Sequence, residues 1–252
     1  MVKSGDIIAV WFSCGAASAV AAKRTIELYG KDVVRVINNP VAEEHHDNRR
    51  FLHDVEKWIG KKIEIATNKH YPSCSAEDVW EKRKYMSGTK GAPCTYELKK
   101  QARQQWEDDN KTDWMVLGFT ADEKARSDRF MQRERGNLLP VLIDAGLTKV
   151  DCFKIIQAAG IALPEIYSLG YPNANCIGCV KATSATYWNH VRKTHGDIFE
   201  RRAKQSRELG VRLARHKGKR VFLDELPADA KGHKIKNTGS ECGLFCEEKG
   251  GM

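Results

Sequence analysis

The beginning of the chain carries the feature that most constrains its fold. Residues 7–12 form an unbroken apolar run, Ile-Ile-Ala-Val-Trp-Phe, which is typical of a buried strand of a parallel sheet. Residues 13–18 are small and predict a tight loop, and residues 19–29 have the pattern of a helix that Gly30 ends. This order predicts an opening strand–loop–helix unit whose helix N-terminus lies at the carboxyl edge of the sheet, where such folds bind ligands.

Further strands and helices alternate through the first half of the chain. The pattern predicts strands over 33–37, 62–66 and 114–118, and a helix over 48–59 that stops at Gly60. Strands that alternate with helices form parallel sheets through right-handed crossovers. We therefore expect an α/β fold, a parallel sheet with helices on both faces.

The second half of the chain has a different character. Its pattern predicts a loop at 164–172 and helical additions at 149–159, 183–195 and 197–209. Residues 227–252 are rich in Gly and Lys and lack periodicity, which indicates a C-terminal tail. We expect one α/β domain over residues 1–226 with helical insertions, followed by this tail.

Charge and composition narrow the class of partner. The 252 residues include 42 Lys or Arg and 33 Asp or Glu, a net charge of +9, which favours a nucleic acid or a phosphorylated small molecule. No apolar run approaches the roughly 18 residues of a membrane span, and the first residues do not resemble a signal peptide. We therefore expect a cytoplasmic protein with no membrane partner. In such a protein, eight cysteines favour metal or redox chemistry over structural disulfides.

The small residues at 13–18 are suited to binding an anion. Without bulky side chains, the backbone N–H groups can approach a phosphate, and the dipole of the following helix favours negative charge. The sequence is neither the Gly-Lys-Ser/Thr loop of nucleoside triphosphatases nor the Gly-x-Gly-x-x-Gly dinucleotide motif. An ordinary tight turn, packed with small residues, is the alternative.

Three cysteines have the spacing or position of ligands. Cys176 and Cys179 form a Cys-x-x-Cys pair around Gly178, which suits zinc, a redox disulfide or an iron–sulfur cluster. The pair does not follow a strand, which weakens the redox-disulfide interpretation. Cys94 lies where Pro93 and Thr95 mark a helix start, a position that lowers the pKa of a thiol.

Basic residues offer further candidate contacts. Arg126 and Arg129 are three residues apart, so one phosphate or sulfate group can meet both, although a solvated helix face has the same spacing. The basic run at 212–220 suits a nucleic acid or, equally, a solvated turn. His45 and His46 are adjacent and point in different directions, so we expect no metal there.

The loop also resembles a known nucleotide-binding motif. Residues 12–18, Phe-Ser-Cys-Gly-Ala-Ala-Ser, resemble the PP-loop of the adenine-nucleotide alpha-hydrolase superfamily, and most closely that of the phosphoadenylyl-sulfate (PAPS) reductase family. Segments 44–48 and 118–129 resemble later motifs of that family in the same order, with Thr120 in place of an arginine. The ATP-cleaving members carry Ser-Gly-Gly-x-Asp-Ser, so Cys14 and Ala17 are departures.

The resemblance implies an adenine-nucleotide alpha-hydrolase-like fold and an adenine nucleotide as substrate. The nucleotide-binding residues that it implies are Ser13, Cys14, Gly15, Ala16, Ala17, Ser18, Arg126 and Arg129.

The cluster-bearing branch of the same family implies a [4Fe-4S] cluster. By resemblance, its ligands here are Cys94, Cys176 and Cys179, and sulfur-transferring PP-loop enzymes on tRNA also resemble this three-cysteine pattern, with one open iron. The fourth ligand is left open between the tail (Cys246), Cys14 and a non-protein group.

The tail carries the last part of the resemblance. Residues 240–246, Ser-Glu-Cys-Gly-Leu-Phe-Cys, resemble the family's C-terminal Glu-Cys-Gly-Leu-His, whose cysteine attacks the sulfur of the sulfonucleotide. Cys242 is then the catalytic residue, and Phe245 stands in place of the histidine. The added Cys246 pairs with Cys242 in a disulfide or supplies a ligand.

The resemblance implies an enzyme, with two candidate reactions. The first is sulfonucleotide (PAPS or adenylyl-sulfate) reduction through an S-sulfo-cysteine at Cys242, with a thioredoxin-type reductant and release of sulfite. The alternative is an ATP-dependent, iron–sulfur-dependent sulfurtransferase that thiolates a nucleic acid or a nucleotide. A nucleotide-binding protein without catalysis is a third hypothesis, and the sequence leaves homodimer formation open.

Overall fold

The computed structural model describes residues 1–89 and 91–235. The chain forms two compact units, which we call unit 1 and unit 2. Each unit is assembled from separate stretches of sequence. The single domain over residues 1–226 with a C-terminal tail stays a prediction. Unit 1 comprises residues 1–40, 46–66 and 103–167, and unit 2 comprises the described residues of 41–45, 67–102 and 168–235.

Unit 1 contains a four-stranded parallel sheet. Its strands are β1 (Ile8–Phe12), β2 (Val34–Asn38), β3 (Glu64–Ile65) and β4 (Trp114–Val116), in the order β3-β2-β1-β4. All three strand pairs are parallel. The α/β fold predicted from the alternating pattern is confirmed, although β3 and β4 are shorter than expected.

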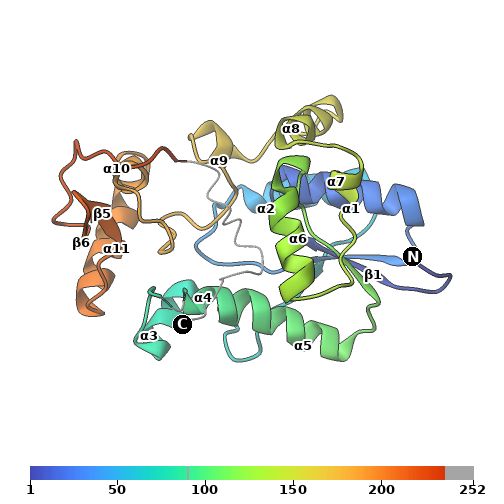
Figure 1. Cartoon of the computed structure of the whole chain (residues 1–252), viewed down its shortest axis with the longest axis horizontal. Coiled ribbons are helices and arrows are strands. Elements are labelled where there is room, and N and C mark those ends of the chain that lie inside the picture. Colours follow the sequence, from blue (N-terminus) through green and yellow to red (C-terminus); the bar gives the residue numbers. More distant parts are fainter. Residues whose placement is uncertain (90, 236–252) are drawn as a thin grey trace. The chain divides into compact units, whose positions relative to one another are not determined.

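Helices cover both faces of this sheet (Figure 1). On one face, alternate residues of β1 pack with helices into a single apolar core. These helices are α1 (Ala16–Tyr29), α2 (Asn48–Ile59), α7 (Val141–Asp144) and α8 (Lys149–Ala158). On the other face lies α5 (Ala102–Asp109), whose Trp106 packs edge-on against Trp11 of β1 with ring centroids 5.5 Å apart.

The ends of the unit 1 helices follow local sequence signals with one difference. Helix α2 ends at Gly60, which has the left-handed φ of 62° that favours glycine, as predicted. Helix α1 ends before Gly30 but begins at Ala16, three residues before the predicted start at 19. The alanines of the predicted loop are strong helix formers, so the helix begins directly after Gly15.

Unit 2 is mainly helical. It contains α3 (Ala76–Arg83), α4 (Pro93–Thr95) and a π-helical segment, η1 (Tyr96–Gln101), that leads into α5. The two long predicted helices are confirmed as α10 (Ala185–Thr194) and α11 (Gly196–Glu208). The predicted loop at 164–172 instead contains the short helix α9 (Glu165–Ser168), at the junction of the two units.

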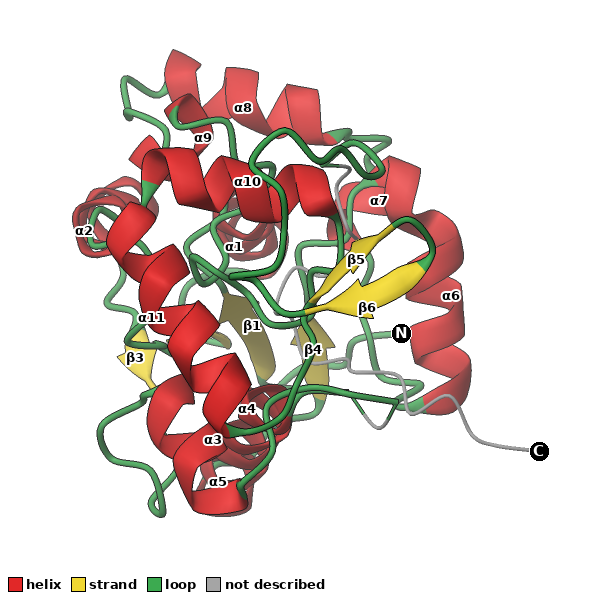
Figure 2. Cartoon of the chain, turned by 90° about the vertical axis from the view of Figure 1, so that its left-hand side faces the viewer, coloured by secondary structure: helices red, strands yellow, loops and turns green. Residues whose placement is uncertain are grey.

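The basic run after α11 forms a hairpin that the sequence pattern did not predict. Its strands are β5 (Ala214–His216) and β6 (Lys219–Val221), which pair antiparallel (Figure 2). Each strand has only three residues. So short a stretch shows no clear alternation of apolar and charged residues, so the sequence pattern predicted no strand there. Over residues 1–89 and 91–235, no helix has both the length and the apolarity needed to cross a membrane.

Candidate nucleotide and thiol sites

The small-residue loop lies at the carboxyl end of β1 and is closed by Ser18. The Ser18 hydroxyl donates to the carbonyl of Gly15 at 2.9 Å and accepts from the backbone N–H of Ser13 at 3.1 Å. The Ser13 hydroxyl also reaches it, at 3.2 Å. Ser18 is 1% exposed, and these hydrogen bonds of its side chain fix the shape of the loop.

The N-terminus of α1 has the properties of an anion-binding helix end. Its N-cap residue is Gly15, which has no side chain to cap the helix, and its first turn contains no acidic residue. The N–H of Ala16 donates to the hydroxyl of Tyr167 at 3.3 Å. Because α1 has 14 residues, its dipole favours negative charge at this end.

Gly118, which follows β4, lies against this loop. A Cβ at this position would lie 2.8 Å from the backbone nitrogen of Ser18 and 3.0 Å from its Cα. Both atoms belong to a buried backbone that cannot easily move. Only glycine therefore allows β4 to end beside the loop, a requirement that sequence reasoning missed.

Cys14 turns the loop through its backbone and packs its side chain inside. Its φ of 57° lies in the left-handed region that favours glycine, the residue usual at this position in the resembling motif. Its thiol is 3% exposed and accepts a hydrogen bond from Asn38 Nδ2 at 3.5 Å. The thiol belongs to the core of unit 1, and its assignment as a cluster ligand stays a prediction.

The predicted arginine pair lies on helix α6 (Lys124–Arg133). Arg126 already has a carboxylate partner, since it donates to Glu123 at 2.7 Å, and its guanidinium lies 5.1 Å from the centre of the Phe119 ring. Arg129 is exposed. Both arginines share a helix as predicted, but a phosphate at Arg126 would have to compete with Glu123.

Thr120, which replaces an arginine of the resembling motif, has a structural role. It caps the short 3-10 helix η2 (Ala121–Glu123) in a reciprocal capping box with Glu123. The same carboxylate therefore caps η2 and pairs with Arg126. Thr120 positions the start of α6 rather than contributing charge.

The Cys176–Cys179 loop in unit 2 is held by three contacts. The N–H of Ile177 donates to the carbonyl of Glu43 at 3.0 Å. Gly178 has a left-handed φ of 66°, and a Cβ there would lie 3.1 Å from Ile198 Cγ2. The N–H of Cys179 donates to the hydroxyl of Tyr187 at 2.9 Å. Two backbone hydrogen bonds and the close approach at Gly178 therefore restrain the loop.

The hydroxyl of Tyr187, on α10, interacts with the Cys-x-x-Cys pair. Burial raises its pKa well above the ordinary value, and negative charge on Cys179 and Cys176 raises the pKa further. The hydrogen bond from the Cys179 N–H acts in the opposite direction. The pair is thus coupled to a buried hydroxyl, through the backbone hydrogen bond of Cys179 and through charge.

Cys94 lies in the first turn of α4, which begins at Pro93 as predicted. It is half-buried, as are Cys176 and Cys179, and all three belong to unit 2. A held loop and a helix start that present soft thiol donors fit an iron–sulfur cluster or zinc. The donor set thus fits the [4Fe-4S] cluster that the resemblance implies.

Unit 2 also contains a buried ion pair that the sequence did not predict. Lys99 of η1 lies 3.1 Å from Glu44, and their side chains are only 6% and 8% exposed. Burial raises the pKa of the nearby Cys74 thiol, while the charge of Lys99 lowers it. No periodicity marks a lysine as buried, so a single sequence carries no signal for this pair.

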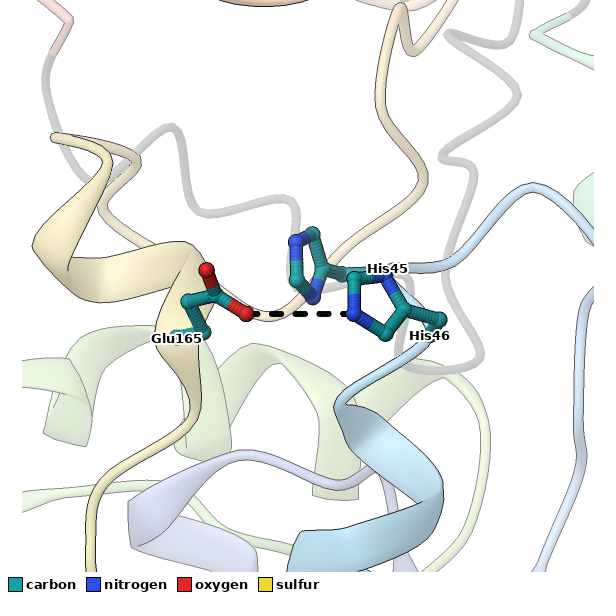
Figure 3. Close-up of side chains that lie close together, drawn as sticks. All are labelled: His45, His46 and Glu165. Atoms are coloured by element: carbon teal, nitrogen blue, oxygen red, sulfur yellow. Dashed lines mark ion pairs between the residues drawn. The ribbon is translucent and has the colours of Figure 1, made fainter.

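His46 and Glu165 meet at the surface of unit 1 (Figure 3). Their closest atoms are 3.9 Å apart, and the side chains are 85% and 52% exposed. Such exposed pairs contribute little to stability. His45, the preceding residue, belongs to unit 2, where its ring lies edge-on to that of His195 with centroids 6.3 Å apart.

Two predicted site residues lie outside the described residues. Cys242, the predicted nucleophile, and Cys246, a predicted ligand, fall in residues 236–252. Both assignments stay predictions.

Comparisons with known proteins find similarity among solved structures. No protein-family model matches the sequence, and no curated protein matches it. Among solved structures, the chain is similar to the U34-tRNA thiolase NcsA from Methanococcus maripaludis, solved with its [4Fe-4S] cluster. The identity is 11% and the TM-score is 0.44, over 82% of this chain and 73% of that chain. Identity this low does not carry residue roles from one chain to the other.

Proposed function

We propose that this chain is a PP-loop enzyme that uses ATP and a cysteine-held iron–sulfur cluster to transfer sulfur to a nucleic acid or a nucleotide. The observation that carries the proposal is the held Cys176–Cys179 loop, in the same unit as Cys94. A fixed pair of half-buried thiols suits a bound inorganic centre better than a free redox pair.

The nucleotide half of the proposal rests on unit 1. The N-terminus of α1 and the loop that Ser18 closes would bind the phosphates of ATP through backbone N–H groups. Gly118 would keep the loop in place. Arg129 and Arg126 would supply positive charge, and Arg126 would do so in competition with Glu123.

The sulfur half of the proposal rests on unit 2. Cys94, Cys176 and Cys179 would hold the cluster, which when bound supplies an iron centre able to hold inorganic sulfide. Tyr187 and the carbonyl of Glu43 would keep the Cys-x-x-Cys loop in its binding conformation.

The proposed reaction has two balanced steps. A carbonyl oxygen of the acceptor attacks the α-phosphorus of ATP, and pyrophosphate leaves. Hydrosulfide then attacks the activated carbon, the C–O bond breaks, and AMP leaves with that oxygen while the sulfur loses its proton. Inorganic sulfide is the co-substrate. Sulfur transfer is also the reaction in the name of the U34-tRNA thiolase, whose [4Fe-4S] cluster is named with it.

The experiment is an anaerobic purification followed by an assay of the products. Iron and acid-labile sulfide are counted, and the protein then receives ATP, sulfide and either bulk tRNA or mixed nucleotides. AMP release together with a thiolated nucleoside in mass spectrometry supports the proposal.

Two cysteine variants make this experiment specific. Cys176→Ser should lose most of the bound iron, whereas Cys152→Ala, whose side chain is buried in α8 of unit 1, should keep it. Full iron content in Cys176→Ser, or no AMP with any acceptor, would overturn the proposal.

The tail sequence favours a second candidate function, sulfonucleotide reduction. Residues 241–244, Glu-Cys-Gly-Leu, are the feature that supports it. Under this candidate, PAPS or adenylyl sulfate with a thioredoxin-type reductant should yield sulfite. Cys242→Ser should abolish sulfite release while nucleotide binding survives, and unchanged turnover in that variant would exclude the mechanism.

A further inference from the structure

The β5–β6 hairpin in unit 2 carries a cluster of exposed positive charges. Strands β5 and β6 are joined through Lys217 and Gly218, whose φ values of 47° and 78° form a tight left-handed turn. Residues 212–221 contain no acidic residue. Five exposed cations lie in this stretch: Arg212, Arg215, Lys217, Lys219 and Arg220.

The described part of the chain does not neutralise these cations. Among the described residues, none of the five forms an ion pair with a carboxylate. The contrast with α11 is direct, because Arg207 there contacts Asp224 at 2.8 Å and Glu225 at 2.7 Å. Carboxylates are thus present in the same unit, but they pair elsewhere.

The strand register sets like charges against each other. Arg215 lies directly opposite Arg220, and His216 lies opposite Lys219. Like charges at directly opposed positions destabilise a hairpin. Partial burial lowers the pKa of Arg220, and the charge of Arg215 lowers it further. A bound anion would remove this repulsion.

Backbone contacts hold the hairpin in shape despite this repulsion. The N–H of Arg215 donates to the carbonyl of Thr183 at 2.8 Å, and Arg220 Nη1 donates to the carbonyl of Leu213 at 2.9 Å. Thr183 follows the thiol loop closely, since the N–H of Ala182 donates to the carbonyl of Cys179 at 3.0 Å. The hairpin is therefore pinned to the chain that leaves the Cys-x-x-Cys loop.

We propose that the hairpin Ala214–Val221 binds the phosphodiester backbone of a nucleic acid, which makes a nucleic acid rather than a free nucleotide the acceptor. The inference rests on the proposed sulfur transfer for its biological role, but not for the binding itself. A two-stranded ribbon is narrow enough to enter a nucleic-acid groove, and several unpaired cations in one ribbon release condensed counterions on binding.

The test is the salt dependence of binding by the full-length protein, without ATP. Fluorescein-labelled tRNA and a duplex DNA are titrated by anisotropy between about 50 and about 200 mM salt. Arg215→Gln/Lys217→Gln should flatten the slope of log K against log salt by about 1.8 for a duplex and by about 1.4 for single strands, one phosphate per cation. The melting temperature of this double variant should not fall, because removing the charge of Arg215 relieves its repulsion with Arg220.

A matched control removes the same charge from elsewhere in unit 2. Lys193→Gln/Lys204→Gln changes exposed lysines of α10 and α11 and should keep the original slope. Equal losses in both double variants would reduce the effect to net charge and overturn the inference. Unchanged binding in the hairpin variant would do the same.

Two further arms separate the alternatives. Phosphatidylserine vesicles bound through the hairpin, with no nucleic-acid binding, would overturn the inference in favour of a lipid surface. Nucleic-acid binding through the hairpin without AMP release under any condition would retain the inference and reject the proposed function.

Discussion

At the scale of single residues, the candidate sites depend on atoms with very little room. The backbone of Ser18 leaves no space for a Cβ at Gly118. The Cys179 N–H lies in a half-buried loop and has a buried hydroxyl, that of Tyr187, as its acceptor. The first feature depends on the absence of one carbon atom and the second on the presence of one oxygen atom, so a single substitution can test each.

Gly118→Ala should destabilise the protein by about 1–3 kcal/mol, because the added methyl group must displace buried backbone. It should also weaken the binding of an ATP analogue, since the displaced backbone is that of the loop. Urea unfolding and calorimetric titration measure the two effects. Gly136→Ala is the matched control, because a Cβ there meets nothing within 4 Å. Equal stability of the two variants would contradict the close approach.

Tyr187→Phe should cost about 1–3 kcal/mol, since it leaves the Cys179 N–H without its acceptor inside the protein. The loop should then open more often, and Cys176 and Cys179 should react faster with a thiol reagent. Unfolding and labelling followed by peptide mass spectrometry measure both. Tyr96→Phe, at a 49% exposed position, should change neither quantity. Unaltered labelling of the pair in Tyr187→Phe would show that other contacts hold the loop.

At the scale of elements, the junction between α10 and α11 concentrates titratable groups. His195 lies there, with its Nδ1 3.0 Å from the hydroxyl of Tyr171 and 3.0 Å from that of Thr194. Burial lowers the pKa of His195, as do His45 and His190, while Asp197 acts in the opposite direction. The junction is therefore built for a neutral imidazole.

The stability of the protein should fall as the pH falls through about 6.5, the ordinary pKa of histidine. Because the folded pKa of His195 is lowered, the unfolded chain binds more protons in the window below 6.5. The stabilisation is complete above that window and is lost within it. Urea midpoints measured from pH 8 to pH 5 check this, and His195→Gln should flatten the pH dependence. An identical slope in that variant would assign the effect to other groups.

At the scale of the whole molecule, the predicted nucleotide and thiol residues fall in different units. Ser13 to Ser18, Arg126 and Arg129 belong to unit 1, whereas Cys94, Cys176 and Cys179 belong to unit 2. The residues predicted for the two functions thus belong to separately packed parts of one chain.

Ligands should therefore protect the two units independently in hydrogen exchange. A non-hydrolysable ATP analogue should slow exchange at residues 13–18 and 117–120 of unit 1, because bound phosphate fixes the loop. Iron chelation should speed exchange at residues 176–179 of unit 2, because the thiols lose a shared ligand. Protection of residues 176–179 by the nucleotide alone would contradict this separation.

The sequence by itself determined the parts whose signals are local. The apolar run of β1, the periodicity of α2 with Gly60 as its stop, and the helix start at Pro93 each depend on residues within a few positions of one another. Backbone propensity and side-chain periodicity act at that range, which is why these elements were predictable.

Only the tertiary structure decided which distant residues meet. Gly118 and Ser18 are 100 positions apart, Glu44 and Lys99 are 55 apart, and the stretches of each unit are interleaved along the chain. Burial of a lysine, a space too small for a methyl group and like charges facing each other in a hairpin arise from packing and register. Those are set by the whole chain at once, and no local pattern records them.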